Sequence, residues 1–304
     1  MERTHRAPPW EVSFFLLAAT WGASFMFIKV GLEALDPLEV AFGRCFLGAL
    51  TLLLLVAITR DRLPRGREIW RRLFVVALVF NAIPFACFSF GEQHVSSVVA
   101  GIWNATTPLF TAMFAMLRLP EERPTPERLT GIGVGFAGAL LVLGPWRGLG
   151  GPTLLGNLLC LGAPICYGIG FIYTRKHLLG RRESLVSLSA AQVSLGSLQL
   201  ALITPFFSDA PSDLNLKVIG AMLALGALGT GFAYVLNYDV IGRAGATTAS
   251  LVTYLVPIFA TVFGVVLLNE QLTWNQPVGA AVIVAGVAVS QGLLHMRQRA
   301  AVAP

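Results

Sequence analysis

The residues best suited to recognise a small ligand are polar and aromatic side chains within long apolar segments. Trp103 and Asn104 lie in the middle of such a segment, at 95–117, and offer an aromatic wall beside an oriented hydrogen-bonding group. Neighbouring segments supply similar chemistry through Trp21, Asn81, Phe85, Tyr167, Tyr234, Asn237, Thr253 and Tyr254. Each alone is more typical of helix packing than of ligand contact. Together they predict a partly apolar binding pocket, with Trp103 as the first candidate.

Two basic residues, Lys29 and Arg44, also lie within apolar segments, where ionisable groups are costly and usually functional. In one interpretation they attract or gate an anionic group, such as a substrate carboxylate. In the other, their long side chains reach the outer membrane interface and pair with Glu33, Asp36 and Glu39. The sequence leaves both interpretations open.

Two prolines occupy matching places in the two halves of the chain, Pro108 and Pro257. A proline within a helix frees a backbone carbonyl and bends the helix. These kinks either shape a cavity and act as hinges, or are tolerated bends without moving parts. Glu122 and Glu270 follow the prolines, and we expect each to cap the helix that comes next.

Catalytic chemistry is hard to assemble from this sequence. The four histidines lie at the termini or near the ends of apolar segments, and no Asp or Glu lies clearly at a segment midpoint. The cysteines have neither metal-ligand nor disulfide-framework spacing. We therefore expect no catalytic residue, metal or cofactor, and no carboxylate proton relay.

The composition defines the elements that must position these residues. Hydrophobic residues make up 55% of the 304 residues, charged residues only 12%, and the mean hydropathy is +0.71. Soluble proteins carry about twice that charged fraction, so this composition excludes a soluble enzyme, a disordered protein and a disulfide-stabilised secreted domain. We predict an all-α integral membrane protein with transmembrane helices near 11–32, 37–58, 73–91, 95–117, 128–145, 153–174, 184–206, 216–238, 245–268 and 273–294.

Basic residues predict the orientation of these ten helices. Most of the 22 Lys and Arg residues fall in segments that share one side of the membrane if the N-terminus is cytoplasmic. Both termini are therefore expected in the cytoplasm. The same bias explains the net charge of +6 without a nucleic-acid partner.

The two halves repeat an ordered set of residues. Pro108-Leu-Phe-Thr precedes Glu122 and the pair Gly131/Gly138, while Pro257-Ile-Phe-Ala precedes Glu270 and the pair Gly279/Gly286. Each half, 11–145 and 153–294, contains five predicted helices, so the second half must enter the membrane inverted. Inverted repeats are typical of secondary transporters, whose substrate site lies between the repeats near the membrane midplane. The glycine pairs suit close packing against another helix or a second copy of the chain.

Trp21-Gly-Ala-Ser-Phe25 with Lys29, Pro37 and Arg44, followed by Pro108-Leu-Phe-Thr and Glu122-Arg-Pro-Thr-Pro, resembles the EamA family of the drug/metabolite transporter superfamily. The resemblance covers nearly the whole chain. It implies ten helices in two inverted five-helix repeats around a central cavity, lined mainly by helices 1, 3, 4, 6, 8 and 9. It also implies export of amino acids or other metabolites across the bacterial cytoplasmic (inner) membrane.

These observations predict a secondary transporter that exports a small molecule, most simply an amino acid, by alternating access. With no visible coupling carboxylate, a facilitator or an exchanger is expected. An exporter of drugs or other amphipathic compounds is the alternative, and a membrane receptor or intramembrane enzyme is the alternative from another class. The expected partners are the small-molecule substrate and the lipid bilayer, and a homo-oligomer is possible. Trp103→Ala is expected to reduce transport without disturbing folding.

Overall fold

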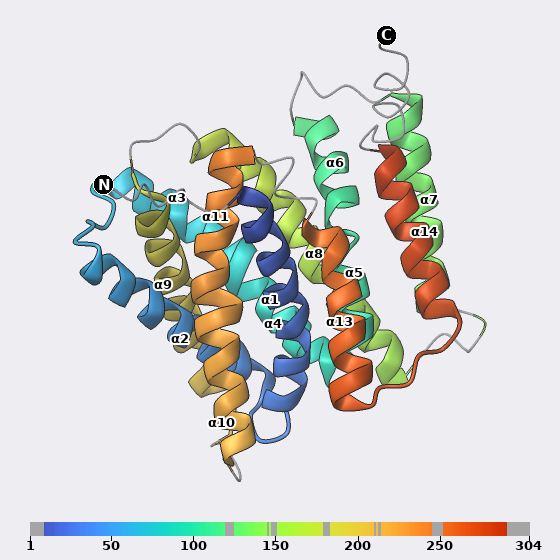
Figure 1. Cartoon of the computed structure of the whole chain (residues 1–304), viewed down its shortest axis with the longest axis horizontal. Helices are drawn as coiled ribbons and strands as arrows, with labels where there is room; N and C mark the ends of the chain where they lie inside the picture. Colours follow the sequence, from blue (N-terminus) through green and yellow to red (C-terminus); the bar gives the residue numbers. More distant parts are fainter. Residues whose placement is uncertain are drawn as a thin grey trace, which may run out of the picture.

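The computed structural model describes residues 9–118, 125–144, 146, 151–178, 183–209, 211, 214–244 and 252–290. All regular secondary structure within these residues is helical (Figure 1). The bundle is built from α1 (Trp10–Gly31), α2 (Pro37–Ile58), α3 (Arg67–Ala77), η1 (Leu78–Ala82), α4 (Ile83–Glu92), α5 (Ser97–Asn104), α6 (Thr107–Arg118), α7 (Pro126–Leu143), α8 (Gly151–His177), α9 (Leu185–Ile203), η3 (Thr204–Phe206), α10 (Leu216–Leu223), η4 (Ala224–Phe232), α11 (Ala233–Ala244), α13 (Val252–Leu268) and α14 (Asn275–Ser290).

Eight continuous or composite helices in the described part of the chain are long and apolar enough to cross a membrane. They match the first eight predicted segments closely; the third, for example, runs from Arg67 to Glu92 where 73–91 was predicted. The last two predicted segments correspond to the shorter apolar helices α13 and α14. Parts of both predictions, 245–251 and 291–294, lie outside the described residues.

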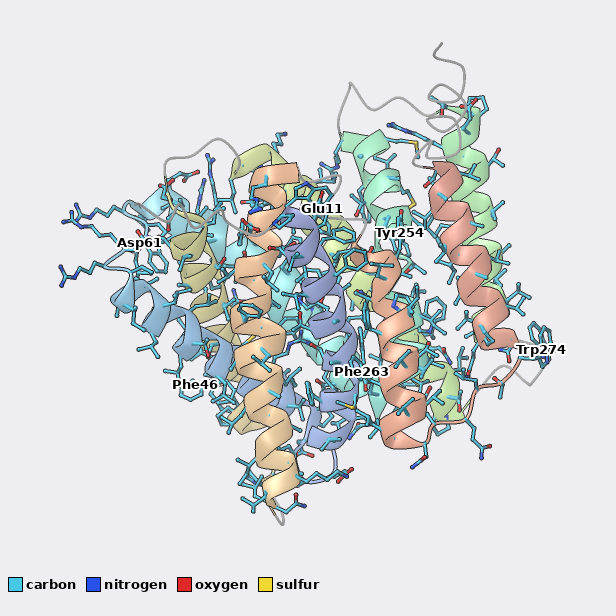
Figure 2. All side chains as sticks on the ribbon, viewed as in Figure 1. Glu11, Phe46, Asp61, Tyr254, Phe263 and Trp274 are labelled. Atoms are coloured by element: carbon cyan, nitrogen blue, oxygen red, sulfur yellow. The ribbon has the colours of Figure 1, made fainter. Side chains whose placement is uncertain are left out.

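The exterior of the bundle is apolar, as expected for a surface that faces lipid. Leu54, Ile58 and Val266 are 61%, 69% and 67% exposed. Figure 2 shows Phe46 and Trp274 at the periphery, where both side chains are exposed. With the eight long apolar helices, this surface defines a multi-pass membrane protein.

Three of the long helices are interrupted where they pass the interior. The π-helical segments η1 and η4 interrupt the third and eighth helices, and such segments are frequent at functional sites. The fourth helix breaks at Ala105–Thr106, so that Pro108 lies in the first turn of α6. Pro257, by contrast, lies inside the continuous helix α13. The two matched prolines therefore have different local structures.

Helices α7 and α14 lie side by side at one edge of the bundle (Figure 1). A Cβ atom added at Gly131 would lie 2.3 Å from the Ser290 nitrogen, and one at Gly286 would lie 2.3 Å from the Gly135 nitrogen. Only glycine permits this approach of the two backbones. The repeated glycines thus join two helices of the same chain.

Candidate functional site

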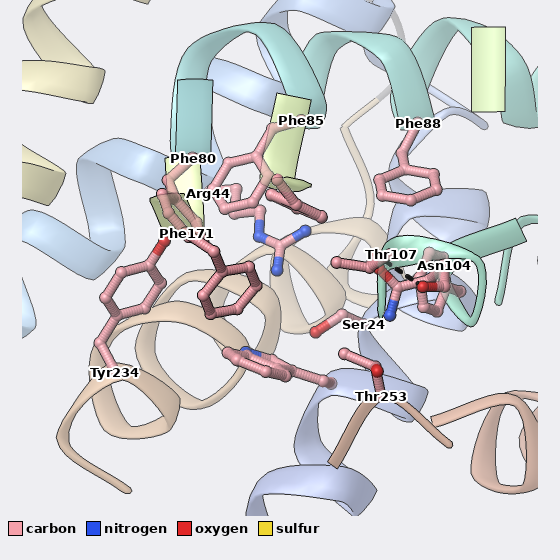
Figure 3. A pocket seen from close by; sticks show the side chains of 13 residues that line it. Ser24, Arg44, Phe80, Phe85, Phe88, Asn104, Thr107, Phe171, Tyr234 and Thr253 are labelled. Atoms are coloured by element: carbon pink, nitrogen blue, oxygen red, sulfur yellow. Dashed lines mark hydrogen bonds between the residues drawn. The ribbon is translucent and has the colours of Figure 1, made fainter. Parts of the chain in front are cut away.

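The candidate site is a cavity of about 60 Å³ inside the helix bundle (Figure 3). Helices from both halves of the chain form its wall. Most of the wall is aromatic, and hydroxyl, amide and guanidinium groups supply its polar part. The lining residues are Trp21, Ser24, Phe25, Arg44, Phe80, Phe85, Phe88, Asn104, Thr107, Tyr167, Phe171, Tyr234 and Thr253.

The cavity brings together many of the residues that the sequence analysis selected from separate segments. The selected residues in the wall are Trp21, Arg44, Phe85, Asn104, Tyr167, Tyr234 and Thr253. Those placed outside the wall are Lys29, Asn81, Trp103, Pro108, Asn237, Tyr254 and Pro257. Six further lining residues are small hydroxyl residues or phenylalanines, which are common in any membrane helix and were not predicted: Ser24, Phe25, Phe80, Phe88, Thr107 and Phe171.

Arg44 supplies the positive charge of the cavity. Its side chain is only 6% exposed, its Nε donates to Thr230 Oγ1 at 2.9 Å, and its Nη2 donates to the Gly229 carbonyl at 3.4 Å. The guanidinium carbon lies 3.8 Å from the centroid of the Phe85 ring, a cation–π geometry. No described carboxylate lies within ion-pair distance of it.

The remaining N–H groups of Arg44 are available to a ligand. A guanidinium carries five N–H donors, and the described residues supply two hydrogen-bond partners for them. Figure 3 shows the guanidinium projecting into the space between the labelled aromatic side chains. A buried cation with spare donors and no acidic partner is suited to bind an anionic group.

Asn81 lies behind the wall and positions Tyr234. Its Nδ2 donates to the Tyr234 hydroxyl oxygen at 2.7 Å, and its Oδ1 accepts from Gln192 Nε2 at 2.9 Å. The Tyr238 hydroxyl donates in turn to Gln192 Oε1 at 3.3 Å. This network joins η1, α9 and α11, and it fixes the orientation of one polar group that faces the cavity.

Trp103, the first candidate from the sequence, faces away from the cavity. The side chain is 3% exposed, and its indole Nε1 donates to Asn157 Oδ1 of α8 at 2.7 Å. Asn157 is itself held by the Thr153 carbonyl at 2.8 Å. In this conformation Trp103 joins α5 to α8, while the adjacent Asn104 lines the cavity.

Lys29 has partners other than the acids next to it in sequence. Its Nζ donates to the carbonyl oxygens of Glu92 and Val95, the latter at 2.9 Å. Glu33 instead pairs with Lys217 at 2.6 Å, and Asp36 with Glu39 forms the capping box of α2. Asn237 and Tyr254 also lie outside the wall and are partly buried, and the Tyr254 hydroxyl finds no hydrogen-bond partner among the described residues.

Glu270 caps a helix from the other half of the chain rather than the next helix. Its carboxylate accepts from the backbone nitrogens of Ser97 and Val98 at 2.8 and 3.1 Å, and from Ser97 Oγ at 3.0 Å. It therefore satisfies the N-terminus of α5, where a negative charge is favourable. Its predicted counterpart Glu122 lies outside the described residues.

The family model of the EamA-like transporter family matches residues 8–144 and again residues 154–291. The chain therefore belongs to this transporter family.

Similar proteins are found in archaea and bacteria. An uncharacterized transporter of Archaeoglobus fulgidus is 29% identical over 92% of this chain and 97% of its own length. The transporter YoaV of Bacillus subtilis is 26% identical over 88% of this chain and 91% of its own. Protein PagO of Salmonella typhimurium is 26% identical over 82% of each chain. A solved crystal structure shares the fold, with a TM-score of 0.68 over 95% of this chain and 98% of that one at 19% identity.

Proposed function

We propose that this protein is a secondary transporter that exports small metabolites, most simply amino acids, by alternating access around the Arg44 cavity. The observation that carries the substrate class is the buried guanidinium of Arg44, which has no acidic partner among the residues that the structure describes. A substrate carboxylate would complete its hydrogen bonds. The aromatic wall would accept a partly apolar side chain, and Asn104 and Thr253 would contact the polar remainder.

The proposed architecture is ten transmembrane helices in two inverted repeats, 11–145 and 153–294. Two observations support it: the family model matches each half separately, and two shorter apolar helices follow the eight long ones. The clustered basic residues support cytoplasmic termini in a bacterial cytoplasmic membrane. Reporter fusions at the two termini test this orientation, which requires both reporters to be cytoplasmic.

The size of the cavity supports a cycle in which access must change. An engineered cavity of about 150 Å³ admits benzene, whereas this cavity measures about 60 Å³. An amino acid with an apolar side chain would not fit until the wall opens. The structure therefore suits the closed stage of an alternating-access cycle.

Export of amphipathic compounds is the second candidate, and the aromatic wall favours it. The Arg44 charge separates the two candidates, because a buried guanidinium repels the cationic group that many amphipathic drugs carry. Amino acids and neutral or anionic amphiphiles would be accepted by such a cavity, and amphipathic cations would be excluded.

Substrate exchange in proteoliposomes tests the proposal. Vesicles are loaded with one unlabelled amino acid at a time, and entry of the labelled form is followed, with protein-free vesicles as a control. Amino amides, which lack the carboxylate, and an amphipathic cation are measured in parallel. Saturable exchange of amino acids, with much weaker exchange of their amides, is expected. Flux of the cation without amino-acid exchange would contradict the proposal.

A further inference from the structure

Glu92, the last residue of α4, is a buried acid that the cavity does not use. Its side chain is 0% exposed, and neither carboxylate oxygen has a hydrogen-bond partner in the described part of the chain. A buried carboxylate without hydrogen-bond donors is energetically costly, so such a group is retained where it has a function. Its neighbour Glu270 differs, because helix N-terminal donors satisfy both of that residue's carboxylate oxygens.

The groups around Glu92 come from several different helices. Among the described residues, Lys29 of α1, Arg44 of α2 and Glu270 after α13 are the charged groups close enough to interact with it. The buried thiol of Cys160 on α8 also faces it. Glu92 is therefore surrounded by two cations and by one acid, Glu270, whose oxygens already accept hydrogen bonds. The Glu92 oxygens themselves accept none from the described residues.

An aromatic pair separates this acid from the cavity. Phe25 of α1 and Phe88 of α4 meet edge to face with ring centroids 5.1 Å apart, and both line the cavity. Lys29 and Glu92 each lie four residues further along the same two helices, on the same helix faces. The cavity is thus closed on this side first by an aromatic layer and then by a polar layer.

Lys29 joins the two helices in the polar layer. Its ammonium group donates to the carbonyl oxygens of Glu92 and Val95, so it binds the end of α4 through the backbone and not through the carboxylate. The same ammonium would be available to the Glu92 side chain once that group is ionised. Lys29 therefore has two competing acceptors on one helix end.

We propose that Glu92 is the proton-binding carboxyl group that couples transport to the proton gradient, with Lys29 as the group that changes partner. In the closed conformation Glu92 is the neutral acid, and Lys29 donates hydrogen bonds to the Glu92 and Val95 carbonyls. These hydrogen bonds keep the layer of Phe25 and Phe88 closed. Release of the proton to water leaves a carboxylate that takes Lys29 from those carbonyls. The hydrogen bonds of Lys29 to the Glu92 and Val95 carbonyls are then lost, and the layer of Phe25 and Phe88 opens. Rebinding of one proton restores the neutral acid and the closed layer.

This inference rests on the proposed transport function, and the experiment separates the two. Proteoliposomes containing the full chain are assayed for amino-acid exchange without a gradient, and for net accumulation driven by an imposed pH gradient. In the wild type the gradient should drive accumulation. In Glu92→Gln the ratio of gradient-driven flux to exchange should fall about tenfold or more, the usual size of coupling between two sites. Glu92→Asp, which keeps an acid, should recover part of the ratio.

Glu33→Gln is the matched control. Glu33 is an acid that follows α1 and pairs with the exposed Lys217, away from the aromatic layer. Its ratio should equal that of the wild type. Exchange without any effect of a pH gradient in the wild type would overturn the inference and leave the proposed function intact. A wild-type ratio in Glu92→Gln would also overturn it. Absence of all exchange in the folded wild type would instead overturn the proposed function.

Infrared spectroscopy provides a second readout that does not depend on transport. The neutral carboxyl group should give a C=O band distinct from carboxylate bands in the purified wild type. This band should shift in Glu92→Asp and be absent from Glu92→Gln. A band that is identical in the wild type and in Glu92→Asp would overturn the assignment, even if Glu92→Gln does not fold.

Discussion

Replacement of Arg44 by glutamine tests whether this side chain binds the substrate carboxylate. Two guanidinium N–H groups are already used, on Thr230 and on the Gly229 carbonyl, and up to three of the five donors remain. Hydrogen bonds to a charged group contribute about 1.5–3 kcal/mol. Losing them should therefore raise the KM for an amino acid about 10- to 100-fold.

The assay compares each substrate with its own amide in proteoliposomes. An amino amide lacks the carboxylate, so Arg44→Gln should change its weak flux much less than it changes the flux of the amino acid. Arg44→Lys keeps the charge but loses the planar donor fork of the guanidinium. Its KM for the amino acid should lie between those of the wild type and Arg44→Gln. Arg71→Gln is the control, because Arg71 is an exposed residue paired with Glu68.

Stability is not expected to confound this comparison. Thr230 Oγ1 also donates to the Leu225 carbonyl at 3.3 Å, so it keeps a partner when the guanidinium is removed. The cation–π contact with Phe85 accounts for about 0.5–2 kcal/mol, and size-exclusion profiles will show whether the variant is folded. An equal rise in KM for the amino acid and its amide would refute a carboxylate contact and leave Arg44 a packing residue.

Three further predictions concern the scaffold. Gly131→Ala should lower the stability to thermal unfolding by about 1–3 kcal/mol, because the added carbon would lie 2.3 Å from the α14 backbone. Gly133→Ala is the control, since a carbon added there meets open space. Equal unfolding midpoints for the two variants would contradict this packing. Trp103→Ala should lower stability by about 3–5 kcal/mol because the ring is buried, so an unchanged midpoint with lost transport would indicate ligand contact instead. Glu270→Gln should speed amide hydrogen exchange at the start of α5 about 10- to 100-fold, and unchanged exchange would exclude the cap.

The length of the apolar segments makes most of the helices predictable, but the interruptions within the helices have no comparable signal in the sequence. The third helix begins six residues before its predicted start, at Arg67, since Arg71 and Arg72 lower the local hydropathy although they continue the helix. The π-helical segments contain ordinary apolar residues and one polar residue each, Asn81 and Thr230. Their geometry depends on contacts with α2 and α9, which are distant in sequence.

The composition of the site is more predictable than its individual members. Trp103 and Asn104 are adjacent in sequence, and adjacent helical residues point about 100° apart. One contacts Asn157 and the other the cavity. Their order in the chain does not say which one faces inward, because that depends on how α5 is rotated against α8. Phenylalanines present the same difficulty: Phe88 lines the cavity, while Phe15 is 57% exposed on the lipid-facing surface.

Glu92 shows the limit of judging depth from position along the chain. The predicted helix ends at residue 91, one residue before this acid, and no carboxylate proton relay is predicted from the sequence. Its environment is set instead by α1, α8 and the segment after α13, and its side chain is fully buried. A helix that ends inside a bundle buries its last side chain as fully as its middle ones. Charged residues at the predicted ends of transmembrane helices therefore need to be judged by the elements packed over them, and an acid that finds no donor there is a candidate for proton coupling.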